Sequence, residues 1–218
     1  MKLRKFLVSM AAAAGMAVPI AANATLTLTI DDLATAGVDL TLTDPAAINA
    51  FVSNGGGAVG GWLLSVTTGL GNGWSSVFGI DLNSVSVSSR NGGDLRLTLT
   101  ETDLALGLPG PISFGSMIGG TTQGSVAYGA WVDDANAAFG HGAQLFTGAS
   151  GAGAFAASGS QTVAVTDPFS LTLQVDISHI GQKATSFDFA TQVPEPGSLA
   201  LLGIGLLGMA TASRRRKA

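Results

Sequence analysis

Cysteine is absent from this 218-residue chain. Its absence excludes disulfides, thiolate nucleophiles and cysteine-ligated zinc or iron–sulfur sites. Histidine is almost absent too, because only His141 and His179 occur and no H-x-x-x-H spacing joins them. The sequence also lacks the G-x-S-x-G motif of a nucleophile elbow. We therefore expect a protein that is not an enzyme and has no catalytic residues.

Charge is scarce and unevenly placed. Charged residues make up 11% of the chain and hydrophobic residues 46%, which excludes a disordered acidic or basic tail protein. Residues 25–190 contain thirteen acidic and three basic residues, a net charge of −10. A surface with so few cations cannot neutralise phosphates, so we expect no nucleic-acid partner.

The N-terminal segment has the pattern of a secretory signal. Three basic residues stand in the first five positions: Lys2, Arg4 and Lys5. An apolar run follows at 6–17, which is too short to span a bilayer as an uncleaved anchor. Small residues then form a signal-peptidase site made of Ala22, Ala24 and Thr25. We predict a signal peptide over 1–24, cut between Ala24 and Thr25.

The C-terminal segment is a second apolar run. Residues 197–212 carry no charge, and a basic cluster follows them: Arg214, Arg215, Arg216 and Lys217. About 24 Å of helix fits a hydrocarbon core of about 30 Å if the arginines extend to the interface. We predict a transmembrane helix over 198–213 and a cytoplasmic tail over 214–218, because basic clusters stay in the cytoplasm. The alternative is a buried helix of a soluble domain.

A proline-containing segment precedes this helix, with the sequence Val193-Pro194-Glu195-Pro196. Two prolines fix φ and remove backbone donors, so we expect an extended linker over 191–197. The order of this motif, an apolar helix, an arginine cluster and the chain end closely resembles the PEP-CTERM sorting signal, over about residues 193–218. The resemblance implies that an exosortase recognises Pro194, Glu195 and Pro196 and removes the tail. It implies nothing about residues 25–190.

Residues 25–190 show the alternation of β-strands. Apolar and polar residues alternate in many short runs, as at 95–100, and clusters of Gly, Asn and Asp separate the runs. One apolar and one polar face is typical of antiparallel sheets. We predict eight or nine strands in an all-β, antiparallel two-sheet sandwich, jelly-roll-like. Asn91-Gly92 predicts a hairpin between the runs 85–89 and 95–100. A turn or two of helix is expected at 45–52, and a partly ordered strand at 148–160.

Two groups of side chains are candidates for ligand contact. Three aromatic residues are candidates for stacking on a sugar: Trp74, Trp131 and Tyr128. The alternative is that aromatic residues fill the core. Two acidic pairs are candidates for calcium: Asp31, Asp32, Asp133 and Asp134. The alternative for these is turn capping, since no D-x-D-x-D-G loop is present. We expect no other cofactor.

Three classes of function remain open for residues 25–190. The first is a structural or interaction protein of the cell envelope or extracellular matrix, associated with exopolysaccharide or biofilm. The second is a carbohydrate-binding module that recognises the exopolysaccharide. The third is a polysaccharide-active enzyme, for which Glu101 and Asp103 are the formal carboxylate pair. In each case we expect an exported protein that is transiently anchored in the inner membrane, with signal peptidase and exosortase as processing partners.

Overall fold

Strands make up most of the chain that the structure, a computed structural model, describes. The described residues are 24–44, 51–71, 78–107 and 110–193. Their strands are β1 (Thr25–Asp32), β2 (Leu40–Asp44), β3 (Phe51–Asn54), β4 (Gly57–Val59), β5 (Trp62–Leu70), β6 (Phe78–Ser89), β7 (Gly92–Leu104), β8 (Ile112–Thr122), β9 (Ser125–Asp133), β10 (Ala143–Ser150), β11 (Gly153–Val163), β12 (Phe169–Ile180) and β13 (Lys183–Val193). The all-β prediction is confirmed.

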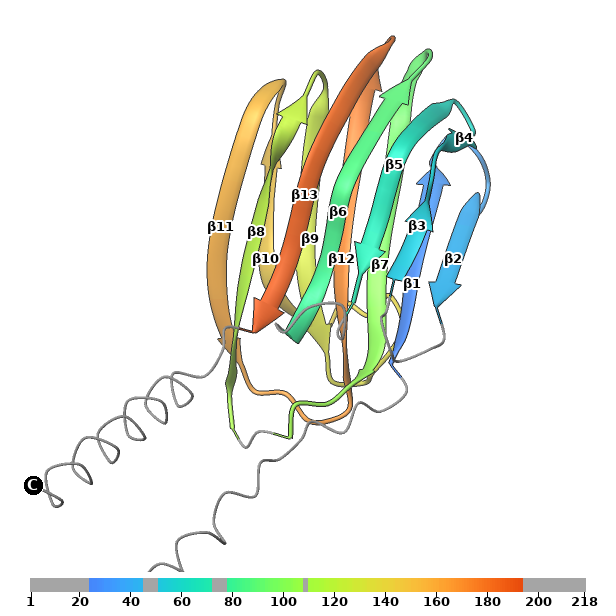
Figure 1. The fold of residues 1–218 in the computed structure, drawn as a ribbon. Helices are drawn as coiled ribbons and strands as arrows, with labels where there is room; N and C mark the ends of the chain where they lie inside the picture. The colour runs from blue at the N-terminus through green and yellow to red at the C-terminus, as the bar shows by residue number, and fades with distance from the viewer. Residues whose placement is uncertain (1–23, 45–50, 72–77, 108–109, 194–218) are drawn as a thin grey trace, which may run out of the picture.

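The strands form two antiparallel sheets packed face to face (Figure 1). Sheet A has six strands in the order β10-β9-β12-β7-β1-β2. Sheet B has seven strands: six in the order β11-β8-β13-β6-β5-β3, with β4 paired to β5. The predicted two-sheet sandwich is therefore confirmed.

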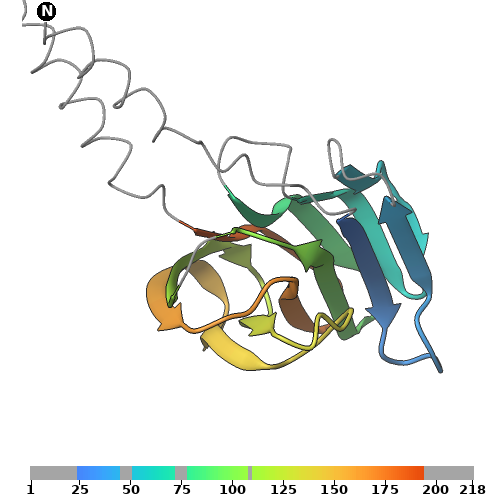
Figure 2. The same cartoon turned by 90° about the horizontal axis from the view of Figure 1, so that it is seen from below.

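The connections between β6 and β13 make the sandwich a jelly roll. Four successive pairs, β6–β7, β8–β9, β10–β11 and β12–β13, each place one strand in sheet B and the other in sheet A. The two strands of each pair therefore lie in opposite sheets, whereas β9 and β10 are hydrogen-bonded neighbours within sheet A. Strands β1 and β2 extend sheet A, and β3–β5 extend sheet B. The view along the strands in Figure 2 shows the two layers.

The alternation of the sequence fills the core between the sheets. Most inward side chains of β7 and β12 are aliphatic, and Leu97, Leu99 and Leu173 are fully buried. The largest fully buried side chains are Trp62, Phe114, Phe169 and Phe189. Phe114 and Phe169 meet edge to face, with 6.2 Å between ring centroids. Aromatic burial of this kind supplies much of the apolar area that stabilises a sandwich.

Both ends of the sandwich domain lie at one pole of the molecule. Strand β1 starts at Thr25 and is parallel to β12, because each pairs antiparallel with β7. Strand β13 follows β12 through a tight turn, so its last residue, Val193, returns to the pole from which β1 starts. In Figure 1 the start of β1 and the end of β13 lie at this same pole.

Several local predictions differ from the structure. The turn at Asn91-Gly92 forms, but its flanking strands β6 and β7 enter opposite sheets, so the predicted hairpin ladder is wrong. Both strands have an apolar face, and facing each other across the core buries both. Residues 148–160 are regular strand on both sides of a turn, and the end of the predicted helical turn, 51–52, is part of β3. Strand β13 continues to Val193, so the first three residues of the expected linker are strand.

The predicted membrane segments lie largely outside the described residues. The predicted signal peptide up to Asn23 and the predicted helix over 198–213 lie outside the described residues. Among the residues that the structure describes, no helix is long and apolar enough to cross a membrane.

Candidate functional site

The outer face of sheet A collects the polar side chains of its central strands. Strands β7 and β12 alternate, so their leucines and valines point inward, and Arg96, Gln174 and Asp176 point outward. The ladder places Asp176 directly opposite Arg96. On the other side of β7, Asp31 of β1 is also opposite Arg96. The guanidinium therefore lies between two carboxylates, in a domain with few cations.

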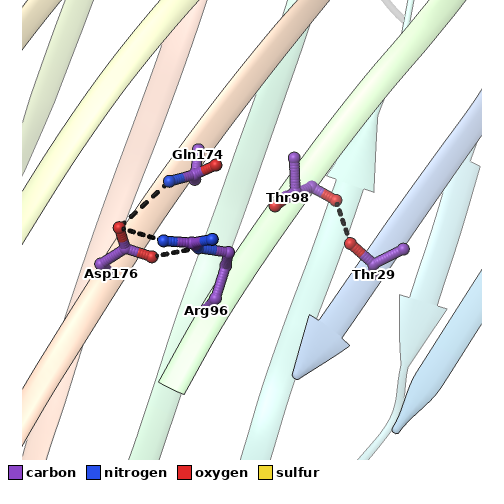
Figure 3. Close-up of polar contacts among 5 residues, drawn as sticks. All are labelled: Thr29, Arg96, Thr98, Gln174 and Asp176. Carbon is purple, nitrogen blue, oxygen red and sulfur yellow. Dashed lines mark hydrogen bonds and ion pairs between the residues drawn. The ribbon is translucent and has the colours of Figure 1, made fainter. Parts of the chain in front are cut away.

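Arg96 and Asp176 form a two-pronged ion pair, shown in Figure 3. Arg96 Nε donates to Asp176 Oδ1 at 2.6 Å, and Arg96 Nη2 donates to Oδ2 at 3.0 Å. Gln174 Nε2 donates to the same Oδ2 at 3.0 Å. The hydrogen bond to Asp176 raises the pKa of Arg96 above its ordinary value, and the charge of Asp31 adds to that effect. Three planar polar groups are thus held in fixed orientation on an exposed sheet.

An aromatic stack adjoins this polar group. Trp131 of β9 is half-buried on the same outer face, and its ring lies over Gly129, where a side chain would collide with it. His141 stacks on Trp131 with 4.0 Å between centroids and 16° between ring planes. One face of the indole is therefore covered by an exposed imidazole. Trp131 thus anchors the segment that carries His141.

The segment 134–142 folds back onto the outer face of sheet A. Asp103 N donates to Asn136 Oδ1, and Asn136 Nδ2 donates to Asp103 Oδ1, both at 2.7 Å. Ser170 Oγ donates to the carbonyl of Ala137 at 2.8 Å. Asn136 and Phe139 have left-handed φ angles of 54° and 59°. These bonds hold a backbone that non-glycine residues seldom adopt, which is common near functional surfaces.

A shallow hollow lies between the stack and the ion pair. Its volume is about 170 Å³, and its lining includes Trp131, Thr147, Gln174 and Asp176. The hollow offers an indole edge, a hydroxyl, an amide and a carboxylate. Groups of these types together bind polyhydroxylated ligands, because each hydroxyl can donate and accept a hydrogen bond.

Two further described aromatic residues, Tyr128 and Trp62, do not reach this face. Tyr128 points to the opposite side of β9, as its odd spacing from Trp131 predicts, and stacks on Phe146 in the core at 5.5 Å. Trp62 is fully buried and packs on His179 at 4.7 Å. Trp74 lies outside the described residues. Of the aromatic residues named for ligand contact, only Trp131 is thus described on an outer face.

The first acidic pair named for calcium does not converge. Asp31 is on the outer face of sheet A, whereas Asp32 is buried on the other side of β1. Asp32 Oδ2 accepts from Gly61 N at 2.7 Å, and its Oδ1 accepts from Ala34 N at 3.1 Å. These contacts are those of turn capping, the alternative for this pair.

The second acidic pair also bonds to neighbouring backbone. Asp133 Oδ1 accepts from Ala135 N at 3.1 Å, and Asp134 Oδ1 accepts from Thr166 N at 3.0 Å. Asp133 ends β9 at the pole opposite the one where β1 ends, so the two pairs are far apart. In the described part of the chain, no three His, Asp or Glu side chains gather as metal ligands.

Glu101 and Asp103, the formal carboxylate pair of a glycosidase, lie in different surroundings. Glu101 is fully buried in the interior, and Asp103 bonds to Asn136 at the outer side. The register of β7 against β12 shifts between Leu171 and Phe169, and Asp103 has a left-handed φ of 58°. This bulge places the two side chains on different sides of β7.

A buried polar chain around His179 was not predicted. His179 is 3% exposed; its Nδ1 lies 2.9 Å from Ser89 Oγ and its Nε2 lies 2.8 Å from Thr185 Oγ1. Thr185 Oγ1 also bonds to Thr122 Oγ1 at 2.7 Å. Burial lowers the pKa of His179, and the charge of Lys183 lowers it further. A neutral imidazole with both nitrogens bonded is a structural core element.

The outer face of sheet B carries a second group that was not predicted. Asp81 of β6 and Asp188 of β13 line a shallow depression of about 430 Å³ with Met117. Asp188 Oδ1 accepts from Ser84 N at 2.6 Å, at a bulge of β6. Burial raises the pKa of Asp81 above its usual value; a hydrogen bond from Asn83 lowers it and the charge of Asp188 raises it again.

Comparison with known proteins bears on the C-terminal segment. Residues 192–217 match the PEP-CTERM protein-sorting motif, which includes Pro194, Glu195 and Pro196 and the basic cluster up to Lys217. The predicted resemblance is confirmed for this segment alone. The motif implies an exported protein that an exosortase sorts and processes. No curated protein matches the chain.

Solved structures resemble the sandwich only distantly. TmCBM61 in complex with β-1,4-galactotriose is 10% identical, with 66% of this chain and 88% of that chain covered and a TM-score of 0.37. Tailspike protein 4 of bacteriophage CBA120 is 13% identical, with 76% of this chain and 18% of that chain covered and a TM-score of 0.32. The K1 adhesin domain of Lys-gingipain from Porphyromonas gingivalis W83 is 11% identical, with 68% of this chain and 99% of that chain covered and a TM-score of 0.30. No function follows from likenesses of this size.

Proposed function

We propose that this chain is a non-catalytic structural or interaction protein of the cell envelope or extracellular matrix, released from the inner membrane by an exosortase. The observation that carries the proposal is the sorting motif at 192–217, fused directly to the last strand of a sandwich. Gln192 and Val193 belong both to the motif and to β13. The exosortase therefore recognises a motif that begins at the end of a central strand of the folded domain.

The common pole of the two ends supports this proposal. Thr25 begins β1 and Val193 ends β13 at the same pole, so a membrane segment at either end holds the same side of the sandwich. Ala24 is buried at 4% exposure. A signal peptidase binds extended, accessible backbone, so we place the cut after Ala24 before the sheet closes around it.

The test is intact-mass analysis of the protein recovered outside the inner membrane. We expect a chain that starts at Thr25 and lacks the residues after Pro196. A variant with Arg214, Arg215 and Arg216 changed to Gln should stay unprocessed, because the positive stop is gone. The matched control is Arg90→Gln, which removes an exposed basic residue of the sandwich. Released protein that keeps its full tail, or normal processing of the triple variant, contradicts the proposal.

The outer face of sheet A favours a second candidate, binding of an exopolysaccharide. The specific observation is the hollow beside Trp131, Gln174 and Asp176, whose polar groups are pre-oriented by the ion pair with Arg96. Rigid planar donors and acceptors lose little conformational freedom on binding a sugar hydroxyl. Few cations surround the hollow, so a neutral glycan suits it better than an acidic one.

Titration with the producing cell's own exopolysaccharide tests this candidate. We expect weak saturable binding that Gln174→Ala reduces at least about tenfold, since two hydrogen bonds are worth about 1 to 3 kcal/mol. Met117→Ala, at an exposed position on the opposite sheet, should leave binding unchanged. Equal loss in both variants, or no binding by the wild type, refutes a site on this face without affecting the sorting proposal.

A further inference from the structure

Strand β11 runs along one edge of sheet B, at the outside of the sandwich in Figure 1. It pairs with β8 over its whole length, from Gly153 opposite Thr122 to Val163 opposite Ile112, without a register shift. Among the residues that the structure describes, no strand pairs with its other side. The eleven residues span about 36 Å at about 3.3 Å each.

A strand paired on one side directs every second N–H and C=O away from its sheet. Such a row of backbone groups pairs readily with another strand, so sheet edges are ordinarily protected by charge, proline, bulges or short length. β11 has none of these devices. Its sequence, GAFAASGSQTV, contains no charged residue and no proline, and residues 135–166 contain no charged residue at all.

The other edges of the sandwich differ from β11. β10, the edge of sheet A beside it, has eight residues and a register shift between Gln144 and Phe146. β2, at the far edge of sheet A, has five residues and ends at Asp44. β3, at the far edge of sheet B, has four residues. Among the described edges, the long, regular and uncharged one is therefore β11.

We propose that β11 is an assembly edge, where it pairs antiparallel with β11 of a second copy of this chain about a twofold axis. Residues 25–190 have a net charge of −10, so two copies repel each other wherever their charged faces meet. The uncharged edge is where that repulsion is smallest. A twofold axis also makes an antiparallel pair self-complementary, so each backbone donor of one copy meets an acceptor of the other.

The side chains of β11 fit this arrangement. A register centred on Ser158 pairs all eleven residues, and the outward side chains are small: Ala154, Ala156, Ser158, Ser160 and Thr162. Small side chains let sheet B of one copy continue into sheet B of the other without steric obstruction. On the inner side, half-buried Phe155 comes opposite Gln161 of the second copy, where the stem of Gln161 can cover the ring.

Disulfide cross-linking tests the register. Because the chain has no native cysteine, any disulfide must involve the introduced residue. Opposed residues of an antiparallel pair have Cα atoms about 4.5 to 5.5 Å apart, within the range for a disulfide. Ser158→Cys should therefore form a covalent dimer under mild oxidation. The matched control is Ser186→Cys, an equally outward, exposed serine on the central strand β13. It should remain monomeric on a denaturing gel.

Charge introduction tests the edge itself, on protein purified from an exporting host and measured by sedimentation equilibrium. Ser158→Lys places two like charges opposite each other and should weaken the dimer about two- to fivefold. Ser186→Lys adds the same charge elsewhere on sheet B and should leave the dimer affinity unchanged. Both variants should retain the wild-type circular dichroism spectrum.

Three results would overturn the proposal: a wild type that stays monomeric at about 0.1 mM, equal cross-linking at both positions, or a dimer indifferent to Ser158→Lys. Loss of the dimer in Ser158→Lys without a disulfide in Ser158→Cys keeps the edge but overturns the register. The sorting proposal depends on none of these outcomes, because it is measured by processing.

Discussion

The buried imidazole of His179 makes the stability of the sandwich dependent on pH. Its side chain is 3% exposed, its two nitrogens bond to Ser89 and Thr185, and Trp62 packs on its ring. Burial, and then the charge of Lys183, lower the pKa of this histidine in the folded protein. Protonation would place a charge among buried groups and convert an accepting nitrogen into a donor.

The sign of the effect follows from the lowered pKa. An unfolded histidine takes up a proton at about pH 6.5, and the folded one takes it up only at lower pH. The stabilisation by neutral His179 is thus complete above about pH 6.5 and is lost as the pH falls from there through the folded-state pKa. Within that window the free energy of unfolding falls by up to about 1.4 kcal/mol per pH unit.

Denaturant unfolding between pH 7.5 and pH 5 measures this slope, with His179→Gln as the test and His141→Gln as the matched control. His179→Gln should lower stability at pH 7.5 by about 1 to 2 kcal/mol, because one hydrogen bond is lost, and should flatten the slope. His141 is exposed, so its replacement removes a histidine without disturbing the buried hydrogen bonds of His179. Identical slopes in the wild type and His179→Gln would refute the reasoning.

Three further predictions concern stability. Asp81→Asn should stabilise the protein at pH 7 by less than about 1 kcal/mol. Because burial raises the pKa of Asp81, its ionised carboxylate destabilises the folded protein only as the pH rises, so the gain from the substitution should vanish in acid. Melting curves at pH 7 and in acid measure the difference. Asp176→Asn should cost about 0.5 to 1 kcal/mol in urea unfolding, a cost that shrinks at high salt because the pair with Arg96 is partly exposed. Phe189→Ala, in the core, should cost about 3 to 5 kcal/mol, against less than about 0.5 for Met117→Ala at the surface; equal costs in these two variants would contradict the assigned burial.

The sequence predicts the faces of the strands better than their partners. Alternation separates Leu97 and Leu99 from Arg96 because the side-chain period of a strand is local. Partner choice depends on how the whole chain closes, which explains why Asn91-Gly92 signals a turn correctly and a ladder incorrectly. The same limit hides the ion pair, since Arg96 and Asp176 are 80 positions apart.

The candidate site was predictable in part. Trp131 is identifiable because an aromatic residue at odd spacing from the core-facing Tyr128 must point outward. The stacking of His141 on Trp131 is not identifiable from the sequence. The stack requires the left-handed backbone at Asn136 and Phe139, positions where glycine would be expected. The sorting motif is the opposite case: its recognition requires no folding, so linear sequence is sufficient.

The place of β13 links translocation to folding. It is the last strand to be exported, yet it lies between β8 and β6. Until it arrives, these two strands have open inner edges, and sheet B consists of two separate halves. If the chain is exported from its N-terminus, sheet B therefore lacks its central strand until β13 is exported. β13 fills this position and leads directly into the sorting motif. We therefore expect completion of the fold and recognition of the motif to involve the same residues, because Gln192 and Val193 belong to both.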